Sequence, residues 1–435
     1  MLSGAEASPP TNEKSKRHVF HLDNHLHATT LDYYLILYVM RGTFTTHQFL
    51  LIIIVLLGHG CKVPAQSSIS GQITLSPEWK PMVYLVQPRS FSEIASNYLG
   101  VVVDSAAISD DGHFTFKPLP ETSNNALLQI TIQKIGNRFT NQLVDEIPGE
   151  ANYMPLVYAA GIPIVINADA SAFQRTFSIR NSTSKNETML SLRSIRLEAF
   201  DILLGATGEK TEADSLLLEK EEAFNQYDKA MIDFADTTRC IEAAMVAIRW
   251  ISPTGDFERV PEFVYGQCQR WQLKEPDHPY TKQLCAAAEK NKLPVMVGDK
   301  MPDFPLPLNN GDTLTLNALL GNRLTLVDIW ASWCAPCRKE NKMVLGPLWR
   351  DYQSKGLQIV GYSIDNNAPS WKSAIEKDGA SWKQASHLSG DSTPFLEALH
   401  ITTIPANFLL NGEGRIVAKN LFGEELSEFV KMYLK

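Results

Sequence analysis

The feature that most limits the fold of this chain is a short apolar segment followed closely by two cysteines. Residues 324–330 read Leu-Thr-Leu-Val-Asp-Ile-Trp, a length typical of a strand and a composition typical of one whose two faces are both buried. Cys334, Pro336 and Cys337 come next, and because proline is tolerated in the first turn of a helix, they mark a helix start. A strand buried on both faces needs covering layers on both sides of its sheet, so we expect an α/β fold here.

The sequence after Cys337 continues to alternate between strand and helix patterns. The expected elements are, in order, a strand at 357–364, a helix around 370–377, an extended segment at 381–388, a short helix at 394–400, a hairpin of 407–410 with 415–418, and a last helix at 424–434. A strand-rich stretch that ends near Leu316 precedes the cysteines. This order describes a central sheet that helices cover on both faces.

Cys334 and Cys337 have the spacing of a redox pair. Cys334 is expected where the strand gives way to the helix, so unpaired N–H groups and the positive end of the helix dipole favour its thiolate and make it the attacking thiol. Cys337, one turn further along, is near enough to close a disulfide yet shielded by the helix, which suits the resolving thiol. We expect Trp330 and Trp333 to flank the pair as apolar cover, and Pro336 to stiffen the first helical turn.

The segment from about Gly298 to Lys435 resembles the TlpA/ResA branch of the thioredoxin superfamily, whose envelope proteins are often grouped with the AhpC/TSA-like redoxins. The residues that carry the resemblance are Gly298–Phe304, Gly311–Leu316, Val327–Arg338 and Ile404-Pro405. A bare Cys-x-x-Cys is a weak signal, but one flanked by tryptophans after an apolar strand is highly specific. The resemblance implies a thioredoxin fold and an enzyme whose only redox group is the Cys334–Cys337 disulfide, with no cofactor.

The resemblance also implies roles for residues outside the two cysteines. Asp328 matches the buried acid of thioredoxins and would accept the proton of Cys337 as that thiol attacks. An unpaired acid on a strand buried on both faces is costly, which favours this role over that of a solvated strand-end carboxylate. Ile404 and Pro405 resemble the cis-proline loop that lies beside the active disulfide and pairs its backbone with a thiol partner. Glu340 matches a common acidic position, with an exposed helical glutamate as the alternative.

One position departs from the family pattern. Relatives often have a proline five residues after the second cysteine, where this chain has Lys342. Because proline kinks a helix, we expect a straighter helix here and a different surface facing the partner.

Two further regions are expected ahead of the redox domain at 298–435, which makes the chain multi-domain. Residues 66–180 contain short strand patterns separated by turn residues, which favours a β-sandwich-like domain. The expected strands are 69–75, 82–86, 101–103, 113–116 and 127–132. Residues 187–295 carry apolar residues at helical spacing, with a capping-box helix start at Thr211–Asp214, which indicates a helical segment.

Three further cysteines, Cys240, Cys268 and Cys285, lie in the helical segment. Their spacings match no metal-site or redox motif. Buried free thiols are the expectation. The alternative is a disulfide between two of the three in an oxidising compartment, and the sequence does not choose the pair.

Residues 1–65 have the pattern of a leader. The apolar run 49–57 is too short to span a bilayer and has the length of a signal-peptide h-region. A short cationic region begins at Met40 and small residues precede Gln66, so we expect translation from Met40 and cleavage before Gln66. The alternatives are an uncleaved membrane anchor and lipidation of Cys61.

The net charge of the chain and the positions of its histidines limit the binding partners and ligands to be expected. The net charge is −8 and no run of Lys and Arg occurs, so nucleic acid is not an expected partner. Beyond the leader the histidines are scattered singly, which argues against a metal site. We expect protein thiols and disulfides as clients, and a membrane electron donor of DsbD/CcdA type.

The expected function is that of an exported thiol-disulfide oxidoreductase. It would reduce protein disulfides in the periplasm or cell envelope, in cytochrome c maturation or thiol maintenance, with an architecture that resembles Bacteroidetes-type envelope proteins. A thiol peroxidase of AhpC/TSA type is one alternative, although Ala331–Trp333 replaces the Pro-x-x-x-Thr-x-x pattern of peroxidatic cysteines. An envelope binding protein with a vestigial redox domain is the other. Ala335 and Pro336 resemble the pair between the cysteines of reducing thioredoxins, which predicts a potential nearer roughly −270 mV than about −120 mV.

Overall fold

The structure, a computed structural model, describes residues 69–435 with the exception of 96–99, 121–122, 124, 139, 141–147, 208–214 and 291. The leader, its cleavage site and the helix start at Thr211–Asp214 lie outside the described residues and stay predictions. Within the described part of the chain, no helix is both long enough and apolar enough to cross a membrane.

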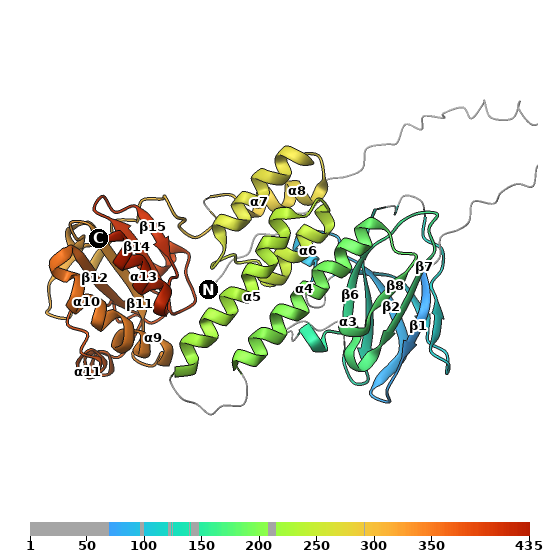
Figure 1. Cartoon of the computed structure of the whole chain (residues 1–435), viewed down its shortest axis with the longest axis horizontal. Helices are drawn as coiled ribbons and strands as arrows, with labels where there is room; N and C mark the ends of the chain where they lie inside the picture. Colours follow the sequence, from blue (N-terminus) through green and yellow to red (C-terminus); the bar gives the residue numbers. More distant parts are fainter. Residues whose placement is uncertain are drawn as a thin grey trace, which may run out of the picture. The chain divides into compact units, whose positions relative to one another are not determined.

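Two four-stranded sheets form the first part of the described chain (Figure 1). Their strand orders are β4-β1-β7-β8 and β3-β2-β5-β6. The bounds are β1 Ile69–Thr74, β2 Trp79–Gln87, β3 Val101–Ala107, β4 His113–Thr115, β5 Leu127–Lys134, β6 Tyr153–Val157, β7 Ile164–Asp169 and β8 Ser178–Arg180, with short helices η1 Phe91–Glu93, η3 Pro148–Glu150, η4 Ala170–Ala172 and α3 Phe173–Thr176. Strands β1 to β5 were expected from the sequence, whereas β6, β7 and β8 were not. Pro155 interrupts the β6 pattern, and β6 lies at a sheet edge, where proline is tolerated.

Five helices follow the sheets and share their apolar core. They are α4 Ser184–Thr207, α5 Ser215–Thr237, α6 Ile241–Ile251, α7 Pro261–Lys274 and α8 Pro279–Ala287. Helix α6 is buried from Ile241 to Trp250, and its residues are apolar except for Glu242 and Arg249. One cluster joins Ile73 and Ile130 of the two sheets to Met245 of α6 and Leu284 of α8. The sheets and the helices are therefore packed as one body.

The expectation of three free thiols in this region is wrong for two of them. Cys268 of α7 and Cys285 of α8 form a disulfide, with 4.9 Å between their Cα atoms, while Cys240 is free and buried. The two helices pack directly against each other. Neither cysteine spacing nor composition specifies that contact, so the sequence could not select this pair.

The C-terminal domain has a five-stranded sheet of order β13-β12-β11-β14-β15. Its elements are β9 Pro305–Pro307, β10 Thr313–Thr315, η5 Leu316–Leu319, β11 Leu324–Trp330, α9 Ala335–Glu340, η6 Asn341–Leu345, α10 Gly346–Tyr352, η7 Gln353–Lys355, β12 Leu357–Ser363, α11 Ala368–Asp378, β13 Lys383–Ala385, α12 Pro394–Leu399, β14 Ala406–Asn411, β15 Ile416–Lys419 and α13 Gly423–Tyr433. Strand β12 is parallel to β11 and β13, and β14 is antiparallel to β11 and β15. The thioredoxin fold is confirmed.

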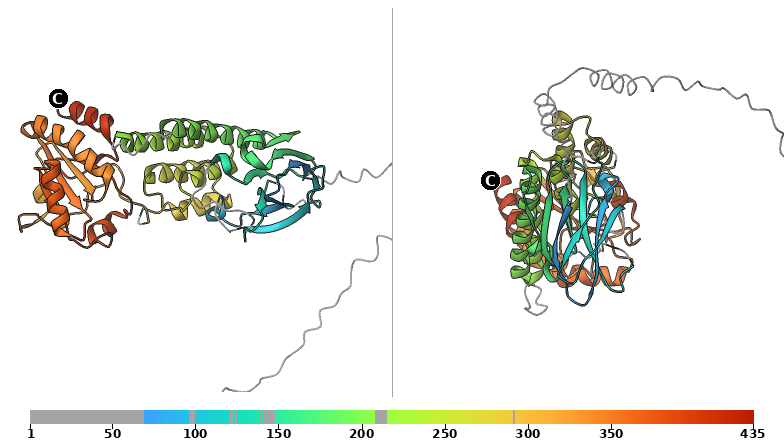
Figure 2. Two further views of the ribbon diagram at one scale, coloured as in Figure 1. Left: turned by 90° about the horizontal axis from the view of Figure 1, so that it is seen from below. Right: turned by 90° about the vertical axis from the view of Figure 1, so that its right-hand side faces the viewer.

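The central strand β11 is buried on both faces, as its composition predicts. Leu324 and Leu326 belong to a core that includes residues of α10 and α13. Val327 and Ile329 belong to a second core that includes residues of α11 and α12. Helices therefore cover both sides of this sheet (Figure 2).

The helix after the two cysteines is not the regular one expected from Lys342. It continues from α9 through the π-helical turn η6, Asn341–Leu345, into α10. Lys342 lies in this turn and forms an ion pair with Asp378 of α11 at 3.3 Å. A π-helical turn is a known cause of irregularity in a helix, so the absence of proline at this position does not produce an uninterrupted α-helix.

Candidate active site

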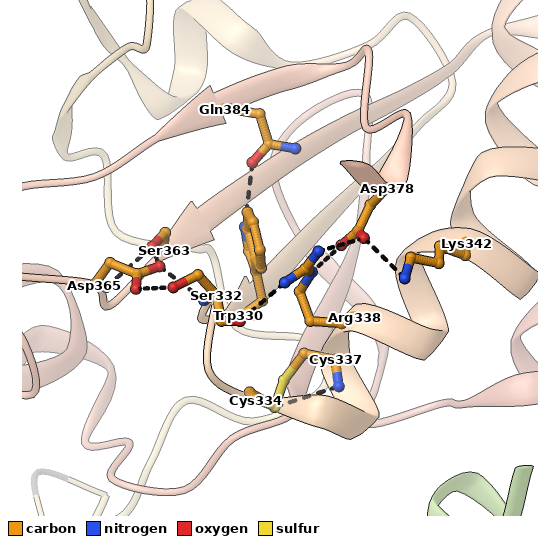
Figure 3. Close-up of polar contacts among 10 residues, drawn as sticks. All are labelled: Trp330, Ser332, Cys334, Cys337, Arg338, Lys342, Ser363, Asp365, Asp378 and Gln384. Atoms are coloured by element: carbon orange, nitrogen blue, oxygen red, sulfur yellow. Dashed lines mark hydrogen bonds and ion pairs between the residues drawn. A yellow bond between two sulfur atoms is a disulfide. The ribbon is translucent and has the colours of Figure 1, made fainter. Parts of the chain in front are cut away.

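The two redox cysteines lie where β11 ends and α9 begins. Cys334 is the N-cap of α9 and forms a disulfide with Cys337 in the first turn. The backbone N–H of Cys337 donates a hydrogen bond to Cys334 Sγ at 3.3 Å (Figure 3). Cys334 is 5% exposed and Cys337 is 1% exposed. The sulfur of Cys334 is thus the one that faces the N–H groups at the helix start, an environment that favours thiolate.

The two tryptophans expected to flank the cysteines lie in different environments. Trp333 is 65% exposed, next to Cys334 in the chain. Trp330 is fully buried, and its indole N–H donates to Gln384 Oε1 at 3.1 Å. Trp330 is therefore a core residue beneath the site, and only Trp333 is a surface neighbour of the cysteines. Pro336 lies in the first turn of α9, as predicted.

Two acids, Asp328 on β11 and Glu340 at the end of α9, are buried close to each other. Burial raises the pKa of Asp328 well above its ordinary value, and the negative charge of Glu340 raises it further. Burial raises the pKa of Glu340 to about 7, against the opposing effects of a hydrogen bond from the Gly423 N–H and the charge of Lys339. Glu340 is 2% exposed, so the alternative of an exposed helical glutamate is wrong.

The loop ahead of β14 contains the expected cis peptide bond, between Ile404 and Pro405. Pro405 is buried, and Ala406 begins β14. Ala406 pairs with Ile329 of β11, one residue before that strand ends. This register places the cis-proline loop beside the end of the strand that leads to Cys334.

Asp365, which the sequence did not single out, holds the segment between β11 and Cys334. Its carboxylate accepts hydrogen bonds from Ser332 N at 2.8 Å, from Ser332 Oγ at 2.6 Å and from Ser363 Oγ at 2.7 Å (Figure 3). Asp365 is 2% exposed. A buried carboxylate thus fixes the residue two positions before the attacking thiol.

Arg338 holds the same segment from the other side. Its Nη1 donates to the carbonyl oxygen of Ser332 at 3.0 Å, and its Nε and Nη2 both donate to the carboxylate of Asp378. Hydrogen bonding to Asp378 raises the pKa of Arg338. Figure 3 shows Asp365 on one side of Ser332 and Arg338 on the other. Both backbone polar groups of Ser332, its N–H and its carbonyl oxygen, are therefore held by charged side chains.

The sequence contains only a weak indication that Asp365 and Arg338 belong to the site. Asp365 follows the carboxyl end of β12, the edge at which functional side chains of parallel sheets gather. Arg338 directly follows Cys337. Their partners lie 33 and 40 positions away, however, and only the fold brings them together.

The arrangement supports exchange of thiols and disulfides. A dithiol at this position can transfer two electrons and become the disulfide observed here, and the buried acids beneath it can take up a proton. Among the described residues, no group of three or more His, Cys, Asp or Glu side chains is placed to hold a metal ion.

Comparison with known proteins agrees with this chemistry. The Redoxin family model matches residues 296–432. The thiol-disulfide oxidoreductase ResA of Bacillus cereus is 26% identical over 148 residues, which cover 34% of this chain and 81% of the relative. The thiol:disulfide interchange protein DsbE of Allochromatium vinosum is 26% identical over 155 residues, 33% of this chain and 82% of the relative.

A solved thiol-disulfide oxidoreductase of Bacteroides fragilis is also similar, at 34% identity and a TM-score of 0.29. The match covers 31% of this chain and 98% of that one. Together, the fold of the C-terminal domain, the family match over residues 296–432 and the curated relatives identify the chain as a thioredoxin-like thiol-disulfide oxidoreductase with a C-terminal redoxin domain.

Proposed function

We propose that this oxidoreductase reduces disulfides of client proteins outside the cytoplasm, with Cys334 as the attacking thiol and Cys337 as the resolving thiol. The observation that carries the proposal is the position of Cys334 as N-cap of α9, where its sulfur accepts the backbone N–H of Cys337. The same contact stabilises a thiolate once the disulfide is reduced. Cys337 is 1% exposed, so it meets a client only through Cys334.

The reaction begins with the reduced enzyme. The Cys334 thiolate attacks one sulfur of a client disulfide, a mixed disulfide forms, and the other client sulfur leaves as a thiolate that takes a proton from water. Cys337 then loses its proton and attacks Cys334 Sγ. The intramolecular disulfide forms, and the second client sulfur leaves as a thiolate that takes a proton from water. Two electrons pass from the enzyme to the client.

Asp328 is the proposed acceptor of the Cys337 proton. Its pKa is raised by burial and by the charge of Glu340, which brings it closer to that of a thiol than an ordinary carboxylate is. A base whose pKa lies near that of the acid it deprotonates transfers protons efficiently in both directions. Glu340 sets the charge next to Asp328.

Export to the periplasm or cell envelope is supported by two independent features. The first 65 residues have the pattern of a leader. Cys268 and Cys285 form a disulfide that lies away from the redox pair in the sequence, and such structural disulfides are typical of oxidising compartments. A protein reductase there needs electrons from across the membrane, so a donor of DsbD/CcdA type is the proposed partner. The names of the relatives agree with thiol-disulfide exchange, and cytochrome c maturation or thiol maintenance, which the resemblance to the TlpA/ResA branch implies, is the proposed pathway.

Reduction of insulin tests the proposal. The chain from Gln66 to Lys435, with dithiothreitol as electron source, is expected to accelerate insulin precipitation without peroxide, and Cys334→Ser is expected to be inactive. Consumption of peroxide in the absence of insulin reduction would favour the thiol peroxidase instead. Inactivity of the unaltered chain in both assays would favour the binding protein with a vestigial redox domain.

A further inference from the structure

A glutamate of the helical segment binds the loop that contains the cis-proline bond. Glu258 lies between α6 and α7, and its Oε1 accepts the backbone N–H of Thr403 at 2.7 Å. Its Oε2 accepts the hydroxyls of Thr402 at 2.6 Å and Thr403 at 3.3 Å. One carboxylate therefore occupies three donors of the two residues that precede Ile404.

Other contacts join the same two parts of the chain. Glu262 of α7 forms an ion pair with Lys419 of β15 at 3.0 Å and accepts the N–H of Val297 at 2.8 Å. Glu258 and Pro405 are both among the residues that line a small cavity at this junction. Helix α5 also contacts α9, the helix that carries Cys337. The helical segment thus contacts both elements that border the redox disulfide.

These contacts bear on how a client reaches Cys334. A backbone N–H at the edge of a loop beside a reactive disulfide is a donor that an extended peptide can use. In this structure the Thr403 N–H already donates to the carboxylate of Glu258. Hydrogen bonds to a charged acceptor are stronger than those between neutral groups. Both threonines are otherwise exposed. A protein client that pairs with this loop must displace Glu258, whereas a small disulfide that needs only the sulfur does not.

We propose that Glu258 is a specificity-determining residue, which lowers the reaction rate of polypeptide disulfides at Cys334 and leaves small disulfides unaffected. The proposal rests on the proposed reductase function and adds a filter to it. The helical segment then acts as part of the client-binding site. Polypeptide clients that pair with the loop must first displace Glu258 and therefore react more slowly, whereas small disulfides that approach with the sulfur alone react at an unchanged rate.

The test uses the chain from Gln66 to Lys435 with Glu258→Ala. Its rate of insulin reduction is expected to rise about tenfold, the factor that corresponds to about 1.4 kcal/mol for one charge-assisted hydrogen bond. Its rate with hydroxyethyl disulfide is expected to stay unchanged. Thr402→Val removes one of the hydroxyl donors to Glu258 and is expected to raise the rate of insulin reduction by less than Glu258→Ala does.

Glu262→Gln is the matched control, because Glu262 lies at the same junction and does not contact the loop. We expect neither rate to change in this variant. An unchanged or lower insulin rate in Glu258→Ala overturns the proposal. An equal rise for both substrates, or an equal rise in Glu262→Gln, also overturns it, since the thiol itself or the whole junction would then be responsible.

A second readout separates this proposal from the proposed function. Reduced Cys334 is labelled with a small maleimide and with a maleimide attached to an extended peptide, neither of which requires turnover. Faster labelling of Glu258→Ala by the peptide reagent alone supports the filter even where insulin is not reduced. Identical labelling of the two chains by both reagents overturns the filter, while failure of the unaltered chain to reduce insulin overturns the reductase function.

Discussion

The molecule contains two disulfides in two differently built regions. Cys268 and Cys285 are 17 positions apart and join two packed helices, with each cysteine beyond the first turn of its helix. Cys334 and Cys337 are three positions apart, at the very start of one helix. The difference shows that the residues around a disulfide, rather than the S–S bond itself, decide whether it serves catalysis or stability. Unpaired helix N–H groups and buried acids suit one pair to electron transfer, whereas closure of a long loop suits the other to stability.

Removal of each pair gives the largest effect and separates the two roles. Cys334→Ser is expected to lower insulin reduction by at least about a thousandfold, because no other cysteine among the described residues is placed to attack. The double change Cys268→Ser with Cys285→Ser is expected to keep full activity and to lower the free energy of unfolding by about 3 kcal/mol, the loop-closure value for this size. Turnover assays and urea unfolding measure the two quantities. Loss of activity in the double variant would show that the helical disulfide takes part in catalysis.

Asp328→Asn tests the acid beneath the redox pair. Without a proton acceptor, resolution by Cys337 is expected to slow by about a hundredfold, at the lower end of general-base effects. Since the pKa of Asp328 is raised, the resolution rate of the unaltered enzyme is expected to rise with pH above the range in which an ordinary aspartate titrates. Quenched-flow measurement of the mixed disulfide gives this rate. A variant that resolves at the normal rate with the normal pH profile would exclude Asp328 as the acceptor.

Glu340→Gln tests how much the buried charge of Glu340 lowers the stability of the folded state. The pKa of Glu340 is raised from 4.5 to about 7, so the folded state binds a proton more tightly than the unfolded state does. Glu340 therefore does not destabilise the folded state below about pH 4. Its destabilising effect grows as the pH rises between the two pKa values and reaches its full size above about pH 7. Glutamine cannot ionise, so the variant is expected to be more stable by about 3 kcal/mol at pH 8 and equally stable at pH 4. Equal stability of the two chains at pH 8 would contradict the raised pKa.

Asp365→Asn gives the smallest effect of the four. An amide has one acceptor oxygen where the carboxylate has two, so the N–H or the hydroxyl of Ser332 loses its partner. The rate of attack by Cys334 is expected to fall about tenfold, with a shift in its pH profile that a purely structural defect would not cause. Ser363→Ala is the control, because it removes a bond to Asp365 and leaves those to Ser332. A pH profile identical to that of the unaltered chain would remove Asp365 from the positioning residues.

The sequence predicted what local pattern determines. Strand β11 was placed correctly because an apolar run of that length has one common structure, and the helix after it because Pro336 and the cysteines mark its start. The cis bond at Ile404-Pro405 followed from family resemblance, and it is present. The contacts of Asp365, Arg338 and Glu258 join residues 33 to 145 positions apart. Such contacts depend on tertiary packing, for which the sequence has no local signal.

The two disulfides are expected to differ in chemistry, and their reduction potentials test this difference most directly. The chain from Gln66 to Lys435 can be equilibrated in dithiothreitol buffers of graded potential, alkylated, and examined by mass spectrometry for the state of each cysteine. We expect Cys334 and Cys337 to become reduced near roughly −270 mV, and Cys268 and Cys285 only below about −300 mV. Reduction of the helical pair first, or a potential of the Cys334–Cys337 pair near about −120 mV, would contradict the assignment of the C-terminal pair as the electron donor to clients.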